Sequence, residues 1–302
     1  MGKIHQLIAK EGIDAAKAIA PASLVDRAAA VMAAESGIGI TYSGFCLTSL
    51  PHRKIPDGDR WVRHGANVIL TIDPGSLPDG KGASKVRGVP YGSRARMILL
   101  YLQTKAVQTG SAEIDLGGSM RDWLTRMGMP DGGKQYRDIR DQADRIAACT
   151  LTFQWRQGNG GYAYVKDTIV RGGFQIPCDD QPRLWTDKVQ LSESFFSALR
   201  AHPVPVAEAA LRQIGGDSAA LDVYCWLAYR LHAIDGPTPI SWAALHQQFG
   251  FSYARLRDFR REFANVLAKA LAVYPDAVVA ADDAGVTLYP SRPPVPERLI
   301  GR

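Results

Sequence analysis

The feature that most constrains the fold is a ten-residue block that occurs twice, at 119–128 and at 241–250. The copies read Ser119-Met-Arg-Asp-Trp-Leu-Thr-Arg-Met-Gly128 and Ser241-Trp-Ala-Ala-Leu-His-Gln-Gln-Phe-Gly250, with apolar residues at the second, fifth and ninth positions of both. Ser caps the free N–H groups at a helix start and Gly readily follows a helix end, so each block predicts a short helix with one apolar face. The recurrence predicts a duplicated structural unit.

The residues around the first block predict a series of short elements. A stripe with helical spacing comes first, and a strand-like stretch separates it from the block. After the block come a Pro-Asp-Gly-Gly turn, a third helix, and two alternating strands around an Asn-Gly tip that is typical of a hairpin. The predicted elements are a helix at 93–109, a strand at 112–116, helices at 120–127 and 134–149, and hairpin strands at 151–156 and 162–165.

The second block has similar surroundings. The elements predicted there are a helix at 217–231, a strand at 239–240, the block helix at 241–250, a third helix from about Tyr253, and hairpin strands at 277–281 and 286–289. Helix, strand, two helices and a hairpin is the order of a winged helix-turn-helix domain, in which the third helix enters the major groove of DNA.

We therefore predict an α+β fold with tandem winged helix-turn-helix domains and an N-terminal helical extension. Residues 1–60 form the extension, with helices on either side of Pro21 and an irregular stretch after them. Residues 61–175 and 176–302 form the first and second winged-helix domains. Within the first, a strand is expected at the end of 61–72 and a Gly/Pro-rich loop at 74–92.

Charge supports a polyanionic partner for the first half of the chain. The sequence has 36 Lys and Arg against 30 Asp and Glu, a formal net charge of +6. Residues 81–105 contain no acidic residue and six basic ones, which are Lys81, Lys85, Arg87, Arg94, Arg96 and Lys105. A patch of one sign is typical of proteins that bind nucleic acid, and a solvated surface face is the alternative.

The third helices supply the remaining candidates for DNA contact, because their outward side chains face the groove. In the first unit Asp138, Asp141 and Asp144 share the helix, so salt bridges within it are an alternative. In the second unit Arg260 lies nearer the apolar side and can extend along it. The predicted DNA-binding residues are Lys81, Lys85, Arg87, Arg94, Lys134, Gln135, Arg137, Arg140, Arg255, Arg257 and Arg261.

Signals for other chemistry are weak. Residues 75–82 match a nucleotide-binding P-loop as far as Gly80-Lys81, but Gly82 replaces the Ser or Thr that holds magnesium and Pro78 interrupts the loop. The six histidines and four cysteines show no metal-ligand spacing, and no apolar run is long enough to span a membrane. We expect no metal, no cofactor and no enzymatic activity, and reduced buried cysteines in a cytoplasmic protein.

Several separated blocks resemble the RepA-type plasmid replication initiators. They are Thr41-Tyr-Ser-Gly-Phe-Cys-Leu-Thr-Ser-Leu-Pro-His-Arg53, Gly88-Val-Pro-Tyr-Gly-Ser-Arg-Ala-Arg96 with Leu99-Leu-Tyr-Leu-Gln103, and Ser119-Met-Arg-Asp-Trp-Leu124 with Gly132-Gly-Lys134 and Tyr136. The resemblance implies binding to repeated sites in double-stranded plasmid origin DNA, opening of the nearby duplex and recruitment of host replication proteins, without catalysis. It also implies exchange between a monomer and a homodimer.

Two other functions stay open. A transcriptional repressor of the same architecture would bind DNA without opening it. An enzyme that uses the loop at 75–81 would bind ATP.

Overall fold

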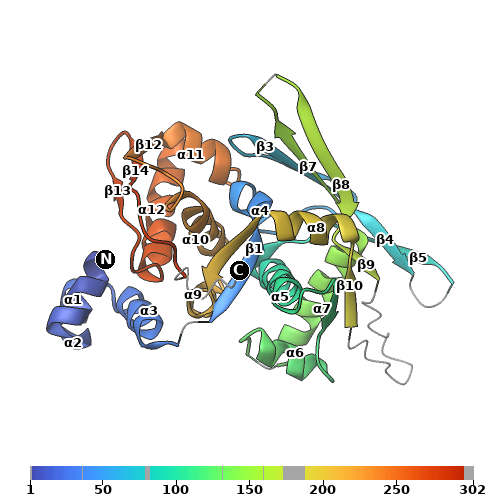
Figure 1. Ribbon diagram of the computed structural model, residues 1–302, viewed down its shortest axis with the longest axis horizontal. Helices are drawn as coiled ribbons and strands as arrows, with labels where there is room; N and C mark the ends of the chain where they lie inside the picture. The colour runs from blue at the N-terminus through green and yellow to red at the C-terminus, as the bar shows by residue number, and fades with distance from the viewer. Residues whose placement is uncertain are drawn as a thin grey trace. The chain divides into compact units, whose positions relative to one another are not determined.

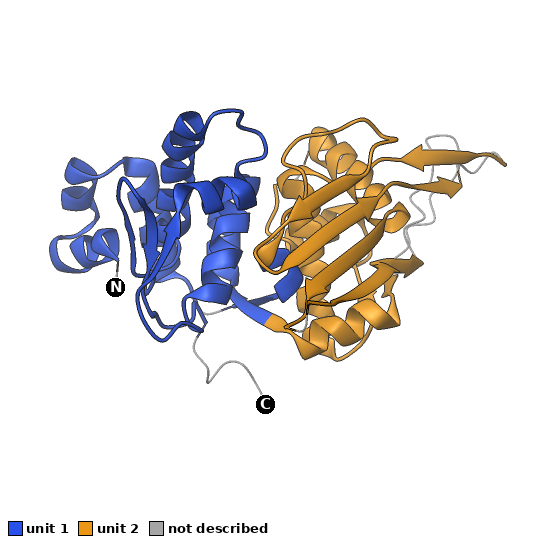
Figure 2. Ribbon diagram, turned by 90° about the horizontal axis from the view of Figure 1, so that it is seen from above, with its two compact units in different colours: residues 1–46, 204–302 blue, residues 47–203 orange. Residues whose placement is uncertain are grey.

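The computed structural model describes residues 2–35, 37–78, 82–130, 132–158, 160–172 and 188–295 (Figure 1). The chain divides into two compact units, which Figure 2 colours separately. Unit 1 comprises residues 1–46 and 204–302, and unit 2 comprises residues 47–203. This division differs from the boundaries expected at 60/61 and 175/176, because residues 1–46 pack with the C-terminal part of the chain.

Unit 1 combines N-terminal and C-terminal elements in one core. Its helices are α1 (Lys3–Glu11), α2 (Ile13–Ile19), α3 (Ala22–Ala33), α4 (Ser43–Leu47), α9 (Glu208–Ile214), α10 (Ser218–Arg230), α11 (Trp242–Phe249) and α12 (Leu256–Ala272). Helix α3 contacts α9 and α12, and its Val25 and Ala28 are fully buried. The apolar stripe predicted for the extension is thus part of this core.

The described part of unit 1 also contains two small sheets. Strand β1 (Ile38–Tyr42), in the stretch expected to be irregular, pairs with β11 (Pro203–Ala207). Strands β12 (Thr238–Ser241), β13 (Val279–Ala281) and β14 (Gly285–Leu288) form an antiparallel sheet in the order β12-β14-β13. Gly285 is required there, because a Cβ atom would collide with the backbone carbonyl of Ile240.

Asp217 joins two helices of unit 1. Its Oδ1 accepts hydrogen bonds from the N–H groups of Ala219 and Ala220, both at 3.1 Å, and its Oδ2 lies 2.7 Å from Nζ of Lys269 on α12. Burial acts to raise the pKa of Asp217, but the bonds from Lys269 and the two N–H groups together lower it below its ordinary value. The charged carboxylate therefore stabilises both the start of α10 and its packing on α12.

We expect Asp217→Ala to lower the free energy of unfolding by about 1–3 kcal/mol, the sum of a lost helix cap and a half-exposed ion pair. Because the folded pKa is lowered, the stabilisation is present above the ordinary carboxyl pKa of about 4 and is lost as the pH falls through the folded value. Urea unfolding followed by circular dichroism at neutral and acidic pH measures both effects. Asp217→Asn keeps a capping side chain, and an equal loss in both variants would contradict the capping role.

Unit 2 contains the other copy of the duplicated block. Its helices are α5 (Gly92–Thr109), α6 (Met120–Arg126), α7 (Gly133–Ala148) and α8 (Glu193–Ala201), and its strands are β2 (Trp61–His64), β3 (Val68–Asp73), β4 (Gly75–Pro78), β5 (Ser84–Arg87), β6 (Glu113–Asp115), β7 (Thr150–Arg156), β8 (Tyr162–Thr168), β9 (Val170–Gly172) and β10 (Lys188–Leu191). The helices, strand and hairpin predicted around this block are confirmed.

In unit 2, some strands that pair are far apart in the sequence, namely β3 with β7 and β6 with β10. One antiparallel sheet has the order β2-β3-β7-β8, and another has the order β6-β10-β9. The short strand β6 therefore pairs with β10 instead of joining the hairpin β7–β8 that follows α7. Strands β4 and β5 form a separate two-stranded ribbon.

The Gly/Pro-rich loop expected at 74–92 is only partly a loop, because β4 and β5 lie within it. The pairing runs from Gly75 opposite Arg87 to Pro78 opposite Ser84. A Cβ atom at Gly75 would collide with the backbone carbonyl of Ala148 at the end of α7, so glycine allows β4 to pack closely there. Gly75, one of the glycines that suggested a loop, instead permits this backbone approach.

The serine caps predicted for the duplicated block are confirmed. Ser119 Oγ accepts from the N–H of Asp122 at 3.2 Å, and Ser241 Oγ accepts from the N–H of Ala244 at 3.3 Å. Gly128 adopts a φ of 67°, a left-handed conformation that favours glycine after a helix. Within the described residues, none of the helices is both long enough and apolar enough to cross a membrane.

Candidate nucleic-acid interface

Helix α12 presents arginines on the side away from its core. Phe259 and Phe263 are 1% and 3% exposed and pack with Trp242, at ring-centroid distances of 6.4 and 6.1 Å. The side chains of Arg257 and Arg261 are 81% and 73% exposed. The outward position predicted for both arginines is therefore confirmed, and Figure 1 shows α12 beside the strands β12, β13 and β14.

The acidic neighbours of these arginines form only surface ion pairs. Arg255, at the N-cap of α12, is 69% exposed and lies 2.7 Å from Asp258, and Arg261 lies 3.2 Å from Glu262. Arg257 is 3.9 Å from Asp258. Exposed pairs of this kind contribute about 0–1 kcal/mol, so a phosphate can replace the carboxylate at little cost.

Arg260 has a structural position, as its place on the helix predicted. Its guanidinium lies 5.2 Å from the ring centroid of Trp242 and 3.0 Å from Asp283 in the β13–β14 turn. Asp282 in the same turn accepts hydrogen bonds from the N–H groups of Ala284 and Gly285. Arg260 therefore joins α12 to the hairpin.

Helix α7 places its four predicted contacts in different environments. Lys134 and Arg137 are exposed, and Arg140 is half-buried. Gln135 is only 8% exposed, and its Oε1 accepts hydrogen bonds from Arg94 Nη2 at 2.9 Å and Nε at 3.2 Å. The outward orientation expected of Gln135 is wrong, because Arg94 on α5 holds the amide against the protein. Arg94 and Gln135 therefore stabilise the contact between α5 and α7.

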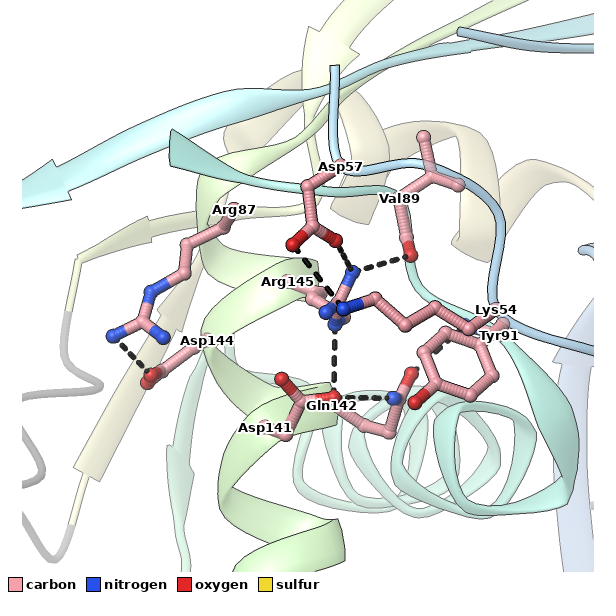
Figure 3. A network of polar contacts seen from close by, with 9 residues as sticks. All are labelled: Lys54, Asp57, Arg87, Val89, Tyr91, Asp141, Gln142, Asp144 and Arg145. Atoms are coloured by element: carbon pink, nitrogen blue, oxygen red, sulfur yellow. Dashed lines mark hydrogen bonds and ion pairs between the residues drawn. The ribbon is translucent and has the colours of Figure 1, made fainter. Parts of the chain in front are cut away.

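A buried arginine connects α7 to two loops (Figure 3). The side chain of Arg145 is 5% exposed, and its Nε lies 2.8 Å from Asp141 on the same helix. Its Nη1 lies 2.9 Å from Asp57 and 3.4 Å from the carbonyl of Val89, while the guanidinium stands 5.2 Å from the ring centroid of Tyr91. One side chain thus orients α7 against residues that lie far from it in the sequence.

The carboxylates of this network respond differently to their surroundings. Burial acts to raise the pKa of Asp57, but the hydrogen bonds from Arg145 and Lys54 lower it overall. Burial raises the pKa of Asp144, although Arg87 opposes this effect. Arg87 lies 2.8 Å from Asp144, and the two side chains are 25% and 13% exposed (Figure 3).

The predicted basic patch is consequently divided. Arg87 pairs with Asp144 and Arg94 with Gln135, whereas Lys85 on β5 is exposed. Lys81 lies outside the described residues, as does part of the loop that resembles a P-loop. Sequence reasoning missed the Arg145 network because its members are dispersed, and the only local signal was the spacing of Asp141 and Arg145, four residues apart on one helix.

Cys46, Cys149 and Cys225 are buried and form no disulfide with a described residue, and Cys178 lies outside the described residues. Burial raises the pKa of the Cys149 thiol to about 12. Within the described part of the chain, no three His, Cys, Asp or Glu side chains are grouped so that they can hold a metal ion.

Comparison with known protein families identifies the family of this chain. The profile described as plasmid-encoded RepA protein matches residues 89–243, about half of the chain, from just after β5 through α5, α6, α7, α10 and into α11. The chain belongs to the plasmid-encoded RepA protein family. The family resemblance inferred from the sequence blocks is thereby confirmed, and membership supports a role in the initiation of plasmid replication. The RepA match ends before α12 begins.

Two solved structures are also similar to this RepA-family chain. Both contain domains 2 and 3 of RctB, one as a selenomethionine derivative, with sequence identities of 13% and 14%. Each comparison covers 82% of this chain and 95% of the other, with a TM-score of 0.48. No curated protein matches the chain.

Proposed function

We propose that this chain is a plasmid replication initiator that binds repeated origin sites through two winged-helix units. In unit 1 the recognition helix is α12, preceded by α10, β12 and α11 and followed by the hairpin β13–β14. In unit 2 it is α7. The observation that carries the proposal is the group of three arginines at the start of α12, Arg255, Arg257 and Arg261, whose side chains are 69–81% exposed.

The position of these arginines suits major-groove binding. The N-terminal residues of a recognition helix contact base edges, and an arginine pairs with two acceptors of one guanine. Arg257 and Arg261 are four residues apart and share one face of α12. Arg255, at the N-cap, is placed for a phosphate.

In unit 2, Lys134 and Arg137 are the proposed contacts from α7, with Lys85 on the β4–β5 ribbon as a phosphate contact. Gln135, Arg94 and Arg87 are left out because protein groups engage their side chains. Opening of the duplex, recruitment of host replication proteins and exchange with a homodimer belong to the same proposal. It includes neither a cofactor nor catalysis.

The experiment that tests the proposal is a footprint on the DNA that flanks the protein's own gene, in a supercoiled plasmid. Protection of repeated sites, together with reactivity of a neighbouring segment toward a single-strand probe, is expected of an initiator. Protection without single-strand reactivity would indicate a repressor. No protection in the flanking DNA would contradict both.

The contribution of unit 2 is tested separately. We expect Lys134→Ala with Arg137→Ala to weaken binding to a cognate duplex and, if both side chains contact phosphate, to reduce the magnitude of the salt slope by about 2. Fluorescence anisotropy at several salt concentrations measures affinity and slope. Lys188→Ala removes an exposed cation from the same unit as a control. An unchanged affinity and slope in the double variant would show that α7 does not contact DNA.

A further inference from the structure

The four-stranded sheet of unit 2 has one buried face and one open face. Val68, Leu70 and Ile72 of β3 and Leu151 and Phe153 of β7 are at most 4% exposed. Successive side chains of a strand point to opposite faces of the sheet, so the residues between these apolar ones share the other face. The far end of the β7–β8 hairpin projects beyond the helices of this unit in Figure 1.

The open face carries aromatic rings beside cations. Tyr162 and Tyr164 of β8 are 54% and 71% exposed, among the most exposed large apolar side chains of the described chain. Register places Arg156 directly opposite Tyr162, Gln154 opposite Tyr164, and Lys166 further along the same face. Opposite side chains in an antiparallel pair have Cβ atoms about 4.5–5.5 Å apart, so each tyrosine has a polar or charged neighbour.

The charge of this face is complementary to a polyanion. Across β2, β3, β7 and β8, all of which are described, the acidic residue on this face is Asp73, at the end opposite the tyrosines and 2.8 Å from Arg60. Arg156 and Lys166 are exposed and form no ion pair with a described residue. Exposed His64 of β2 lies on the same face, in the cross-strand row that ends at Tyr164.

We infer that this face binds single-stranded DNA, with Tyr162 and Tyr164 stacking on bases and Arg156 and Lys166 contacting phosphates. Proteins that bind single strands combine these two features, whereas the bases of a duplex are already stacked inside it. Tyr162 and Tyr164 are two residues apart on β8, which separates them by about 6.8 Å along the strand. Neighbouring bases of a stacked nucleic acid strand are roughly 3.4 Å apart, half that distance. The two rings can therefore stack on two bases that are separated from each other. The inference rests on the proposed function, because the opened origin supplies the single strand.

A second copy of the chain is the competing occupant of this face, since exposed aromatic side chains such as Tyr162 and Tyr164 are also typical of protein–protein interfaces. The charge of the face disfavours contact between two copies of the chain. A symmetric contact through this face would bring Arg156 and Lys166 near their own copies, with Asp73 already paired, and like charges repel. A nucleic acid strand supplies the opposite charge at every nucleotide.

The test uses the full chain and a fluorescein-labelled oligodeoxythymidylate of about 20 nucleotides, longer than one typical binding site. Fluorescence anisotropy measures affinity. Tyr162→Ala and Tyr164→Ala are each expected to weaken binding about 5- to 150-fold, the loss of one stacked base, whereas Tyr164→Phe retains the ring and the affinity. Val165→Thr, on the same strand but on the opposite face, is the matched control and is expected to bind as the wild type does.

The same preparations are titrated with a cognate duplex, and their mass is measured by analytical ultracentrifugation. Loss of single-strand binding with duplex binding retained supports the inference. Wild-type affinity for the oligonucleotide in both alanine variants, or no binding by the wild type, overturns it. A change in oligomeric state without a change in oligonucleotide affinity identifies the face as a subunit interface and also overturns it. Failure of the wild type to bind any origin duplex contradicts the proposed function instead.

Discussion

Replacing Arg257 and Arg261 together by alanine is expected to weaken binding to the cognate duplex by about 2–6 kcal/mol, because each arginine that reads a guanine contributes about 1–3 kcal/mol. Both side chains are highly exposed at the start of α12, and their acidic neighbours hold them only through surface pairs. Removing both side chains is therefore expected to weaken DNA binding while changing the free energy of unfolding very little. Anisotropy with cognate and unrelated duplexes measures the specific loss.

Comparing the affinity for the cognate duplex with the affinity for an unrelated duplex distinguishes base contacts from phosphate contacts. If the arginines contact phosphates, the double variant loses affinity for all duplexes alike and the magnitude of the salt slope falls by about 2. Arg212→Ala is the matched control, since this arginine of α9 is 55% exposed and lies 2.7 Å from Glu208 in a similar surface pair. Equal affinities and slopes for the wild type and the double variant would exclude α12 as the recognition helix.

Arg145→Met is expected to lower the free energy of unfolding by about 3 kcal/mol, near the low end for breaking a buried ion pair. Methionine fills a similar volume but leaves Asp57 and Asp141 without the guanidinium that both approach within 2.9 Å. We expect a loss at the low end of this range because the two carboxylates are 42% and 37% exposed, so water can hydrate them when the guanidinium is absent. Urea unfolding followed by circular dichroism measures the change.

The control for Arg145 is Lys188→Met, which removes an exposed cation that pairs with Glu113 at 2.7 Å and is expected to cost about 0–1 kcal/mol. The pH dependence gives a second readout. Because the folded pKa of Asp57 is lowered, its contribution is present above a pH of about 4 and disappears as the pH falls through the folded value. A loss in Arg145→Met no larger than in Lys188→Met would show that the network contributes little to stability.

Local signals predicted the elements of both duplicated blocks. Ser119 and Ser241 cap their helices as the sequence indicated, and the apolar spacing of α12 correctly placed Phe259 inside and Arg257 outside. These features involve residues within one or two helical turns, where backbone geometry determines which side chains meet. The order of elements and the outward arginines of α12 were therefore readable from the chain.

Contacts between distant residues were not readable. The position of Gln135 was predicted wrongly because its partner Arg94 lies 41 residues away. The glycines at 75–92 suggested a loop, but Gly75 lies in strand β4. Its lack of a side chain allows the strand to pack closely against the backbone of Ala148. The open sheet face that bears Tyr162 and Tyr164 depends on the strand order β2-β3-β7-β8, in which the hairpins β2–β3 and β7–β8 are local but the pairing of β3 with β7 joins residues far apart in the sequence.

The repeated helix blocks, their caps, the amphipathic third helices and the family could be predicted from the sequence, because each is encoded by residue types at short spacings. Three features became visible only in the folded chain: residues 1–46 join the C-terminal unit, Asp57 reaches Arg145 across 88 residues, and only some of the basic side chains remain exposed. Such outcomes depend on which apolar surfaces pack together when the chain folds. A side chain's partners, and hence its availability to DNA, are set by that packing and not by its neighbours in sequence.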